Sequence, residues 1–530
     1  MKMIGDNSNN NKPIIENEIN TQEKGNGICD DKSAANKPSF MVKIKSEFAS
    51  FLEAISKASE PVYLVLLTLY VSIYFILNIA WAENISEFVY NARYVALSIV
   101  MWGTTLYLFF VIAAWKSLWK RTLPLILTGV VLLFATGFFA TKMSTNSYGV
   151  VFDLLFCILA CGKNFKKILN CILGVFVIGL ITAGIGERLG FTYDVLKPNY
   201  ISETHSLGII YPNTWGSLVF IALLILWYLY LRHKPWFTFP LFWSISYIMF
   251  TYISCNTIAG FTAMFPVGAL IIDVIERGSD KKAFSSNSEH EGKKIGFIGW
   301  LVILIPFFAF AFMMFVSMQV EFLHDNFYYT RLHNFAMRFV QGGLYFRTYG
   351  LPIFGNPYRS NVITYVNVNG DFLQVGILDS SFAAYIIMRG MVWLGYTLTW
   401  LSIAHWKALK KRDYAIPYIE TIMLGFAMME RPGLEMWYNF ILLYPLAKVV
   451  SKAGTELKFE KMIYDGVDSV ATDDVVSETV TEVSTDEHLL KPVEFTDDSK
   501  AVTEVSDMST DNDDGDLPDE NTCGEHTVDA

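Results

Sequence analysis

Long apolar runs separated by short polar links make up most of the chain between residues 59 and 450. A hydrocarbon core of about 30 Å needs about 20 apolar helical residues to cross it. The pattern therefore predicts an all-α polytopic integral membrane protein with about twelve transmembrane helices. The break between the seventh and eighth runs is placed near Cys255–Asn256. We expect the helices at about residues 61–80, 93–114, 123–141, 146–162, 167–186, 214–231, 237–254, 256–276, 295–316, 381–402, 413–429 and 435–450.

Polar flanks of residues 1–58 and 451–530 enclose this transmembrane domain. Residues 1–40 are rich in Asn and charged residues, a composition typical of disordered chains. Residues 40–58 space apolar side chains at helical intervals, which fits a helix on the membrane surface or an extension of the first span. The 451–530 segment has no helical or strand period and is expected to be disordered. No apolar run lies near the start, so we expect no cleaved signal peptide.

Composition agrees with a membrane protein, because 53% of the 530 residues are hydrophobic. The net charge of −10 describes the C-terminal tail rather than the membrane domain. Residues 451–530 contain 23 acidic and 5 basic residues, so the preceding part of the chain carries about +8. An ordinary soluble protein is excluded by this pattern.

Lysine and arginine residues alternate between successive links and predict the orientation. With both termini cytoplasmic, the inside links contain about 17 Lys and Arg residues. The short outside links contain only Lys142 and Arg431, with Arg93 at a span edge. Cytoplasmic loops carry such an excess. We therefore expect a cytoplasmic-membrane protein with residues 187–213 and 319–380 outside.

The outer link at residues 319–380, between the ninth and tenth spans, is far longer than an ordinary loop. It contains Arg331, Arg338, Arg347 and Arg359 and few acids. These arginines either have no role, because long loops escape the charge rule, or form an anion site. A guanidinium presents a planar fork of donors that matches phosphate. The aromatic residues around Arg338 and Arg347 predict a segment that folds back onto the membrane, beside a lipid phosphate or pyrophosphate.

The second outer link, residues 187–213, leads directly into the sixth span. Its Pro212–Asn213 pair marks a turn, and Asn213 is a candidate N-cap for the helix. Arg188 and His205 are the groups in this link that suit anion binding or proton transfer. A surface histidine without a role is the alternative for His205.

Ionisable residues inside spans are costly and are usually functional or paired. Arg389 lies about 12 Å from the outer end of the tenth span, and Glu420 about 10 Å from the inner end of the eleventh. We therefore predict an Arg389–Glu420 ion pair, which is either structural or part of a substrate site. Asp153, Asp379 and Glu430 lie within or at the outer edges of their spans, where a site open to the outside would form.

Motifs for nucleotides and metals are absent from the sequence. There is no P-loop and no G-x-G-x-x-G before a helix, and no Cys or His spacing typical of a metal site. The Asp-x-Asp patterns fall in the C-terminal tail, so the outer face has no evident carboxylate set for a metal. We expect no metal, no cofactor and no nucleic-acid partner.

Four stretches around the outer links share their order and placement with a known family. They are THSLGIIYPNTWGSLVF (204–220), NFAMRFVQGGLYFRTYGLPIFGN (334–356), GILDSSFAAYIIMRGMVWLG (376–395) and GFAMMERPGLEMWYNFILL (425–443). The chain resembles the Wzy-type polymerases of O-antigen and exopolysaccharide, within the polymerase–ligase superfamily, over about residues 60–450. It departs from the family at His205, where Arg is frequent, at Ser380 and Phe382, where Asn and Tyr are common, and at 256–260, where an Arg-containing run is frequent.

The resemblance implies an all-helical glycosyltransferase of the C type. Such enzymes transfer a growing glycan from polyprenyl pyrophosphate to the sugar end of a new lipid-linked repeat, on the outer face of the cytoplasmic membrane. The main demand is to stabilise negative charge on the leaving group. The implied site residues fall into two sets. Arg338, with Arg347 or Arg389, would hold the pyrophosphate, with Arg188 and Asn213 also binding substrate. His205, Asp379 or Glu430 would orient the attacking hydroxyl or accept its proton.

Partners implied by the resemblance are the polyprenyl-pyrophosphate-linked oligosaccharide, membrane lipid, a flippase and a chain-length regulator protein. Two other functions stay open at this point. A sugar transporter or lipid-oligosaccharide flippase fits twelve spans, although the two halves show no repeat. An O-antigen-type ligase of the same superfamily would transfer finished chains to another acceptor.

Overall fold

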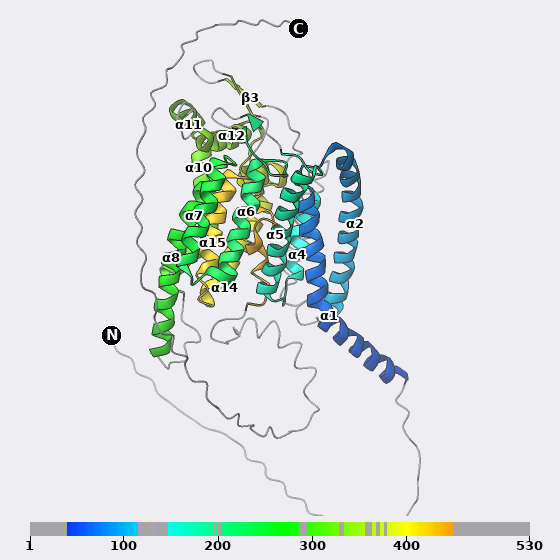
Figure 1. The fold of residues 1–530 in the computed structure, drawn as a ribbon. Helices are drawn as coiled ribbons and strands as arrows, with labels where there is room; N and C mark the ends of the chain where they lie inside the picture. The colour runs from blue at the N-terminus through cyan, green and yellow to red at the C-terminus, as the bar shows by residue number, and fades with distance from the viewer. Residues whose placement is uncertain are drawn as a thin grey trace, which may run out of the picture. The chain divides into compact units, whose positions relative to one another are not determined.

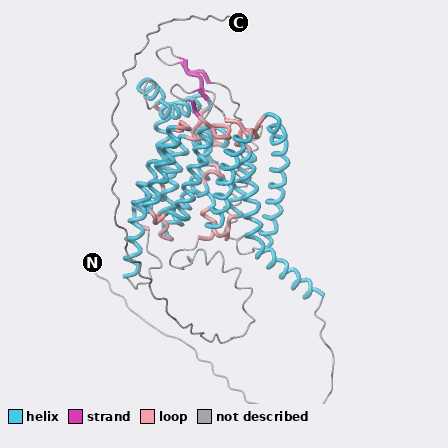
Figure 2. The backbone as a smooth tube through the Cα atoms, viewed as in Figure 1, coloured by secondary structure: helices cyan, strands magenta, loops and turns pink. Residues whose placement is uncertain are grey.

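Helices build almost all of the chain that the structure describes (Figures 1 and 2). The structure is a computed structural model. Both predicted disordered tails and nearly all of the expected third span lie outside the described residues. Within them, the prediction of a helical membrane protein is confirmed at this coarse level. The described residues are 40–114, 127, 129, 131, 147–194, 197–198, 203–285, 295–327, 333–355, 363–366, 372–375 and 379–449.

The helices follow the apolar runs closely. They are α1 (Phe40–Ile76), α2 (Glu83–Ala114), α4 (Ser147–Leu159), α5 (Phe165–Leu189), α6 (Pro212–Leu226), α7 (Pro235–Thr251), α8 (Asn256–Ser285), α9 (Phe297–Ile303), α10 (Ile305–Ser317), α11 (Val320–Phe327), α12 (His333–Tyr349), α13 (Ser381–Arg389), α14 (Met391–Lys410) and α15 (Ala415–Met429). A π-helical turn, Trp227–Leu231, continues α6. Two antiparallel strand pairs are β1 (Lys197–Pro198) with β2 (Glu203–Thr204), and β3 (Ile363–Val366) with β4 (Phe372–Val375).

Four helical segments among the described residues are long and apolar enough to cross a membrane. The bent pair α9 and α10 makes a fifth if its two helices, which meet at 58°, count as one span. The number twelve stays a prediction. Residues 40–58 form the first part of α1, continuous with the span that begins at Ala58, and their place on the membrane surface or in the span stays a prediction. The four segments are Ala58–Ile76, Phe165–Arg188, Pro212–Leu231 and Asn256–Gly278.

The expected tenth span, 381–402, is divided at Gly390 into α13 and α14. Gly390 has a φ of 90°, and a Cβ there would lie 2.3 Å from the carbonyl oxygen of Ile353. Glycine tolerates both the positive φ and the close approach. The N–H of Met391 donates to the carbonyl of Pro352 at 2.9 Å. The segment after α12 therefore packs into the break.

The expected twelfth span, 435–450, is wrong as a helix. Residues 436–447 are buried, but within them only Phe440–Leu443 form a short 3-10 helix. Irregular backbone at membrane depth is tolerated where protein surrounds it and its polar groups find partners. Side chains of α14 donate to backbone carbonyls of this segment: Trp400 to that of Leu442, and Lys407 to those of Tyr444, Pro445 and Ala447. Tyr385 of α13 donates to the carbonyl of Leu434, just before the segment.

The described parts of the links that the sequence places outside lie at one end of the bundle, called the outer end below (Figure 1). Helices α11 and α12 and strand β3 lie at this end, as does the turn between α1 and α2 (Figure 1). Isolated antiparallel bridges join Ile79 to Ile209 and Trp81 to Thr192. The link before α6 is thereby fixed to the turn between α1 and α2.

Candidate functional site

Arg338, on α12, is held by two carboxyl groups from distant parts of the chain. Its Nη2 lies 3.2 Å from Oε1 of Glu430, and its Nη1 lies 3.6 Å from Oδ2 of Asp379. Its Nη1 also donates to the carbonyl oxygen of Met429. The side chains of Arg338 and Glu430 are 11% and 9% exposed, whereas that of Asp379 is 35% exposed. We call Arg338, Asp379 and Glu430 the arginine cluster.

Helix α12 packs closely against the end of α10, and this packing places Arg338 at the outer end of the bundle (Figure 1). A Cβ on Gly343 would lie 1.9 Å from the carbonyl oxygen of Ser317, so a larger residue could not occupy this position without a shift. Ala336, Val340 and Leu344 are buried at intervals of four and form the packing face of α12. The helix is therefore anchored by its own apolar face.

Two serines at the start of α13 fix the positions of the carboxyl residues. Ser380, directly after Asp379, caps α13 because its Oγ accepts from the N–H of Ala383 at 3.5 Å. Ser381 Oγ donates to the carbonyl oxygen of Glu430 at 2.5 Å. Glu430 has an extended backbone directly after α15. The ends of two helices thus bring Asp379 and Glu430 to one guanidinium.

Burial dominates the electrostatics of Glu430. It raises the pKa of Glu430 to about 7, with Arg338 opposing the rise and Asp379 adding to it. Burial also raises the pKa of the Cys255 thiol to about 12, and the Glu430 carboxylate contributes to that rise. Cys255, between α7 and α8, therefore lies within electrostatic reach of the arginine cluster.

Arg389, the last residue of α13, belongs to a second polar group. Its guanidinium carbon lies 4.2 Å from the centre of the Tyr385 ring, and its Nη2 lies 4.0 Å from Oε1 of Glu435. The predicted Arg389–Glu420 pair is wrong, because Glu420 accepts a hydrogen bond from Asn439 at 3.3 Å. The non-helical segment after α15 lies beside α13 and supplies these partners instead of a twelfth helix.

A small cavity of about 40 Å³ lies beside Tyr385, and buried Asp153 of α4 is one of its lining residues. Asp153 accepts a hydrogen bond from the hydroxyl of Tyr70 at 3.3 Å. A space of this size holds water rather than a sugar ring. Its lining residues are Asp153, Leu154, Cys157, Tyr385, Trp393, Tyr396, Thr397, Trp400 and Leu442.

His205 is fixed by Asp194, a residue that the sequence pattern did not single out. Nδ1 of His205 lies 2.6 Å from Oδ2 of Asp194, and the ring stacks on Tyr252 with centroids 4.4 Å apart. Oδ1 of Asp194 accepts from the N–H groups of Ser206 and Leu207 at 2.5 and 3.1 Å. Partial burial raises the pKa of Asp194, but the hydrogen bonds outweigh burial and hold this pKa below its ordinary value. The contact with Asp194 uses Nδ1, so Nε2 is the ring nitrogen left for another partner.

The other predicted arginines do not join the arginine cluster. Arg347 is exposed in the last turn of α12, about two and a half turns from Arg338 and therefore on the opposite side of the helix. Arg188 is exposed in the last turn of α5. Arg331 and Arg359 lie outside the described residues.

Asn213 is not the cap of α6. The helix begins at Pro212 after Tyr211, which makes no side-chain capping bond, so Asn213 is the second helical residue and is exposed. Proline at the first position lacks an N–H, so one of the donors that a cap would satisfy is already missing. Asn213 contributes its backbone carbonyl, which accepts from Ser217 at 2.7 Å.

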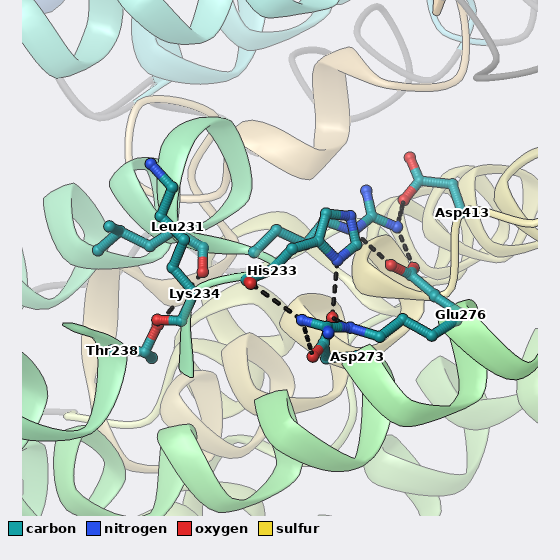
Figure 3. A network of polar contacts seen from close by, with 9 residues as sticks. Leu231, His233, Lys234, Thr238, Asp273, Glu276 and Asp413 are labelled. Atoms are coloured by element: carbon teal, nitrogen blue, oxygen red, sulfur yellow. Dashed lines mark hydrogen bonds and ion pairs between the residues drawn. The ribbon is translucent and has the colours of Figure 1, made fainter. Parts of the chain in front are cut away.

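Figure 3 shows an ion-pair network that joins the turn after α6, helix α8 and the residues before α15, at the end of the bundle opposite to α11 and α12, called the inner end (Figure 1). Arg232, after α6, donates from Nε to Glu276 on α8 at 2.8 Å, and its Nη2 lies 2.7 Å from Asp413 before α15. Beside it, Asp273 lies 2.7 Å from His233 and 2.8 Å from Arg277. This network joins the turn after α6, helix α8 and the residue before α15. It holds these segments together at the end away from the arginine cluster.

The described residues contain no group of three or more His, Cys, Asp or Glu side chains that could hold a metal ion. Comparisons of the chain with protein-family models, characterised proteins and solved structures find no match. The function is therefore argued from the chemistry of the arginine cluster.

Proposed function

We propose that this chain is a membrane glycosyltransferase that polymerises polyprenyl-pyrophosphate-linked oligosaccharide repeats into a cell-surface polysaccharide, on the outer face of the cytoplasmic membrane and without a metal. The observation that carries the proposal is the arginine cluster. A guanidinium that is only 11% exposed lies at the outer end of an apolar bundle, with a half-buried carboxylate beside it. A phosphate group that enters there can replace Asp379 as the partner of Arg338.

The proposed reaction requires stabilisation of negative charge rather than activation by nucleotide. The bond between the anomeric carbon and the pyrophosphate oxygen breaks, and its electron pair stays with the pyrophosphate. The acceptor hydroxyl oxygen bonds to the same carbon. A guanidinium fork donates to two phosphate oxygens at once, and it does so more strongly in a site of low dielectric. Arg338 has that environment.

His205 and Arg389 have supporting roles in this proposal. Asp194 accepts from Nδ1 of His205, which leaves Nε2 as the ring nitrogen that contacts a sugar hydroxyl. Arg389 lies on the same helix that Asp379 precedes and provides a second guanidinium deeper in the bundle. A glycan at the outer end would then contact His205, while the lipid-linked pyrophosphate contacts Arg338.

Purified protein in lipid vesicles, given a synthetic polyprenyl-pyrophosphate oligosaccharide without nucleotide, tests the proposal. A ladder of longer lipid-linked glycans is expected. Transfer only to an added acceptor would identify a ligase, and movement of unchanged substrate across the bilayer would identify a flippase. Either result, or an unchanged substrate, contradicts the polymerase.

The variant Arg338→Lys keeps the charge and loses the fork. We expect its rate of ladder formation to fall at least tenfold, which corresponds to about 1.4 kcal/mol. Arg93→Lys is the matched control, because Arg93 lies on α2 and outside the arginine cluster. Its rate should stay within about twofold of the natural protein. Equal rates for the two variants would remove Arg338 from the site.

A further inference from the structure

Asp379 and Glu430 share one guanidinium, although they differ in surroundings. Oε1 of Glu430 is buried, and it makes no hydrogen bond of good geometry in spite of the ion pair with Arg338 at 3.2 Å. Asp379 is 35% exposed and lies 3.6 Å from the same group. The ionisable groups around Glu430 are Arg338, Asp379, Cys255 and Tyr438. Arg338 is the cation among them.

A pyrophosphate bound to Arg338 changes this balance. It brings negative charge next to both carboxylates and draws the guanidinium away from them. A buried carboxylate that loses its cation and gains an anionic neighbour binds a proton more tightly. Water partly screens the added negative charge at the more exposed Asp379, so the rise in proton affinity is larger for Glu430 than for Asp379.

We propose that Glu430 takes up the proton which the acceptor hydroxyl loses, and that it does so because it shares Arg338 with the leaving pyrophosphate. The inference rests on the function proposed above. The pyrophosphate in the donor is a diester, and after the transfer it is a monoester with about one more negative charge near neutral pH. The same step frees one proton from the hydroxyl. The donor diester carries about one negative charge fewer than the product monoester and therefore disturbs the pair of Arg338 and Glu430 less. Glu430 is ionised beside the donor and protonated beside the product, so the charge of the site is conserved.

The burial of Glu430 suits this role, since burial already raises the pKa of Glu430 to about 7. An ordinary exposed glutamate would need a far larger shift to hold a proton at neutral pH. Product release then returns Arg338 to the carboxylates and frees the proton. The sequence had left Glu430, Asp379 and His205 as equal candidates. The geometry selects Glu430 because it is the buried partner of Arg338.

Isothermal titration calorimetry of the full chain in detergent tests the inference, with farnesyl pyrophosphate as the product analogue and inorganic pyrophosphate as a second probe. At about pH 8, the binding enthalpy should depend on the ionisation enthalpy of the buffer, with uptake of close to one proton per complex. The affinity for farnesyl pyrophosphate should fall up to about tenfold for each unit by which the pH rises in the same range. Uptake with both probes places the linkage at the diphosphate, and uptake with farnesyl pyrophosphate alone requires the lipid as well.

Three variants separate the proton site from the binding site. Glu430→Gln, a neutral isostere, should bind farnesyl pyrophosphate without proton uptake, whereas Asp379→Asn and Glu430→Asp should retain the uptake. Glu187→Gln, a carboxyl change in the last turn of α5, is the control and should match the natural protein. Arg338-dependent binding without proton uptake in the natural protein, or unchanged uptake in Glu430→Gln, overturns the inference and leaves the proposed function standing. Absence of binding overturns both.

Discussion

At the residue scale, the orientation of His205 depends on Asp194. One carboxylate oxygen contacts the imidazole, and the other accepts from the N–H groups of Ser206 and Leu207. Leu207 has a positive φ of 48°, a conformation that a residue with a side chain adopts at some cost. The bonds to Asp194 therefore hold both the histidine and a strained turn.

We expect Asp194→Ala to raise the rate of amide exchange at Ser206 and Leu207 by about 10–100-fold, the equivalent of about 1.5–3 kcal/mol for hydrogen bonds to a charged group. Hydrogen–deuterium exchange with mass spectrometry of peptides that cover residues 203–210 measures this. Asp194→Asn keeps an acceptor oxygen and should show a smaller rise. Glu187→Ala, at the start of the same link, is the control, and an equal rise in it would contradict the prediction.

The same bonds predict a pH dependence for the natural protein. The pKa of Asp194 is lower in the folded chain than its ordinary value of about 3.9. The stabilisation is therefore fully present above the ordinary pKa and is lost as the pH falls through the folded pKa. Protection of the Ser206 and Leu207 amides should persist at pH 7, begin to decline below about pH 4, and be lost once the pH falls below the folded pKa of Asp194.

Sequence reasoning selected Arg338, Asp379, Glu430 and His205 individually, but not the contact of Arg338 with the two carboxylates. Charge within an aromatic segment and carboxylates at span edges are local signals, and they identified these residues. The meeting of two carboxylates at Arg338 depends on where α13 and α15 end, which no local pattern contains. Asp194 was missed because an aspartate in a polar link has no distinguishing pattern in the sequence. Its role is visible only once the turn that it organises is known.

At the element scale, hydrophobicity alone cannot distinguish a membrane helix from a buried irregular segment. The runs 381–402 and 435–450 are equally apolar, but the first breaks at Gly390 and the second is largely non-helical. The non-helical backbone of residues 435–450 is permitted by a buried lysine. Lys407 Nζ contacts the carbonyl oxygens of Tyr444 and Pro445 at 3.3 and 3.2 Å, and that of Ala447 at 2.5 Å.

Lys407→Met should destabilise the protein by several kcal/mol, because each buried carbonyl left without a donor costs about 1–3 kcal/mol. We expect a lower midpoint of thermal unfolding in detergent and earlier proteolytic cleavage after residue 443. Lys410→Met lies one turn later on α14, where the side chain is half-buried, and is the matched control. If both variants unfold at the same temperature, water rather than Lys407 satisfies the segment.

At the scale of the whole molecule, the two ends of the bundle use arginine differently. Arg338 at the outer end has a half-buried carboxylate partner, which a ligand replaces in the proposed function. Arg232 at the inner end is 16% exposed between Glu276 and Asp413, which are 4% and 9% exposed. Pairs whose carboxylates are both buried hold segments in place, and one end of the molecule can therefore stay fixed while substrates enter the other.

Arg232→Gln should consequently damage stability, because it leaves two buried carboxylates without their cation. Breaking a buried pair in this way costs about 3–5 kcal/mol. Arg277→Gln is the matched control, since Arg277 is 56% exposed and its buried partner Asp273 keeps His233 at 2.7 Å, so a smaller loss is expected than for Arg232→Gln. Thermal unfolding in detergent should show a fall of several degrees for Arg232→Gln and little change for Arg277→Gln.

Binding of farnesyl pyrophosphate to the folded fraction of Arg232→Gln should keep its affinity, because the inner network has no contact with the arginine cluster. A loss of affinity in that fraction would instead show that the two ends are coupled.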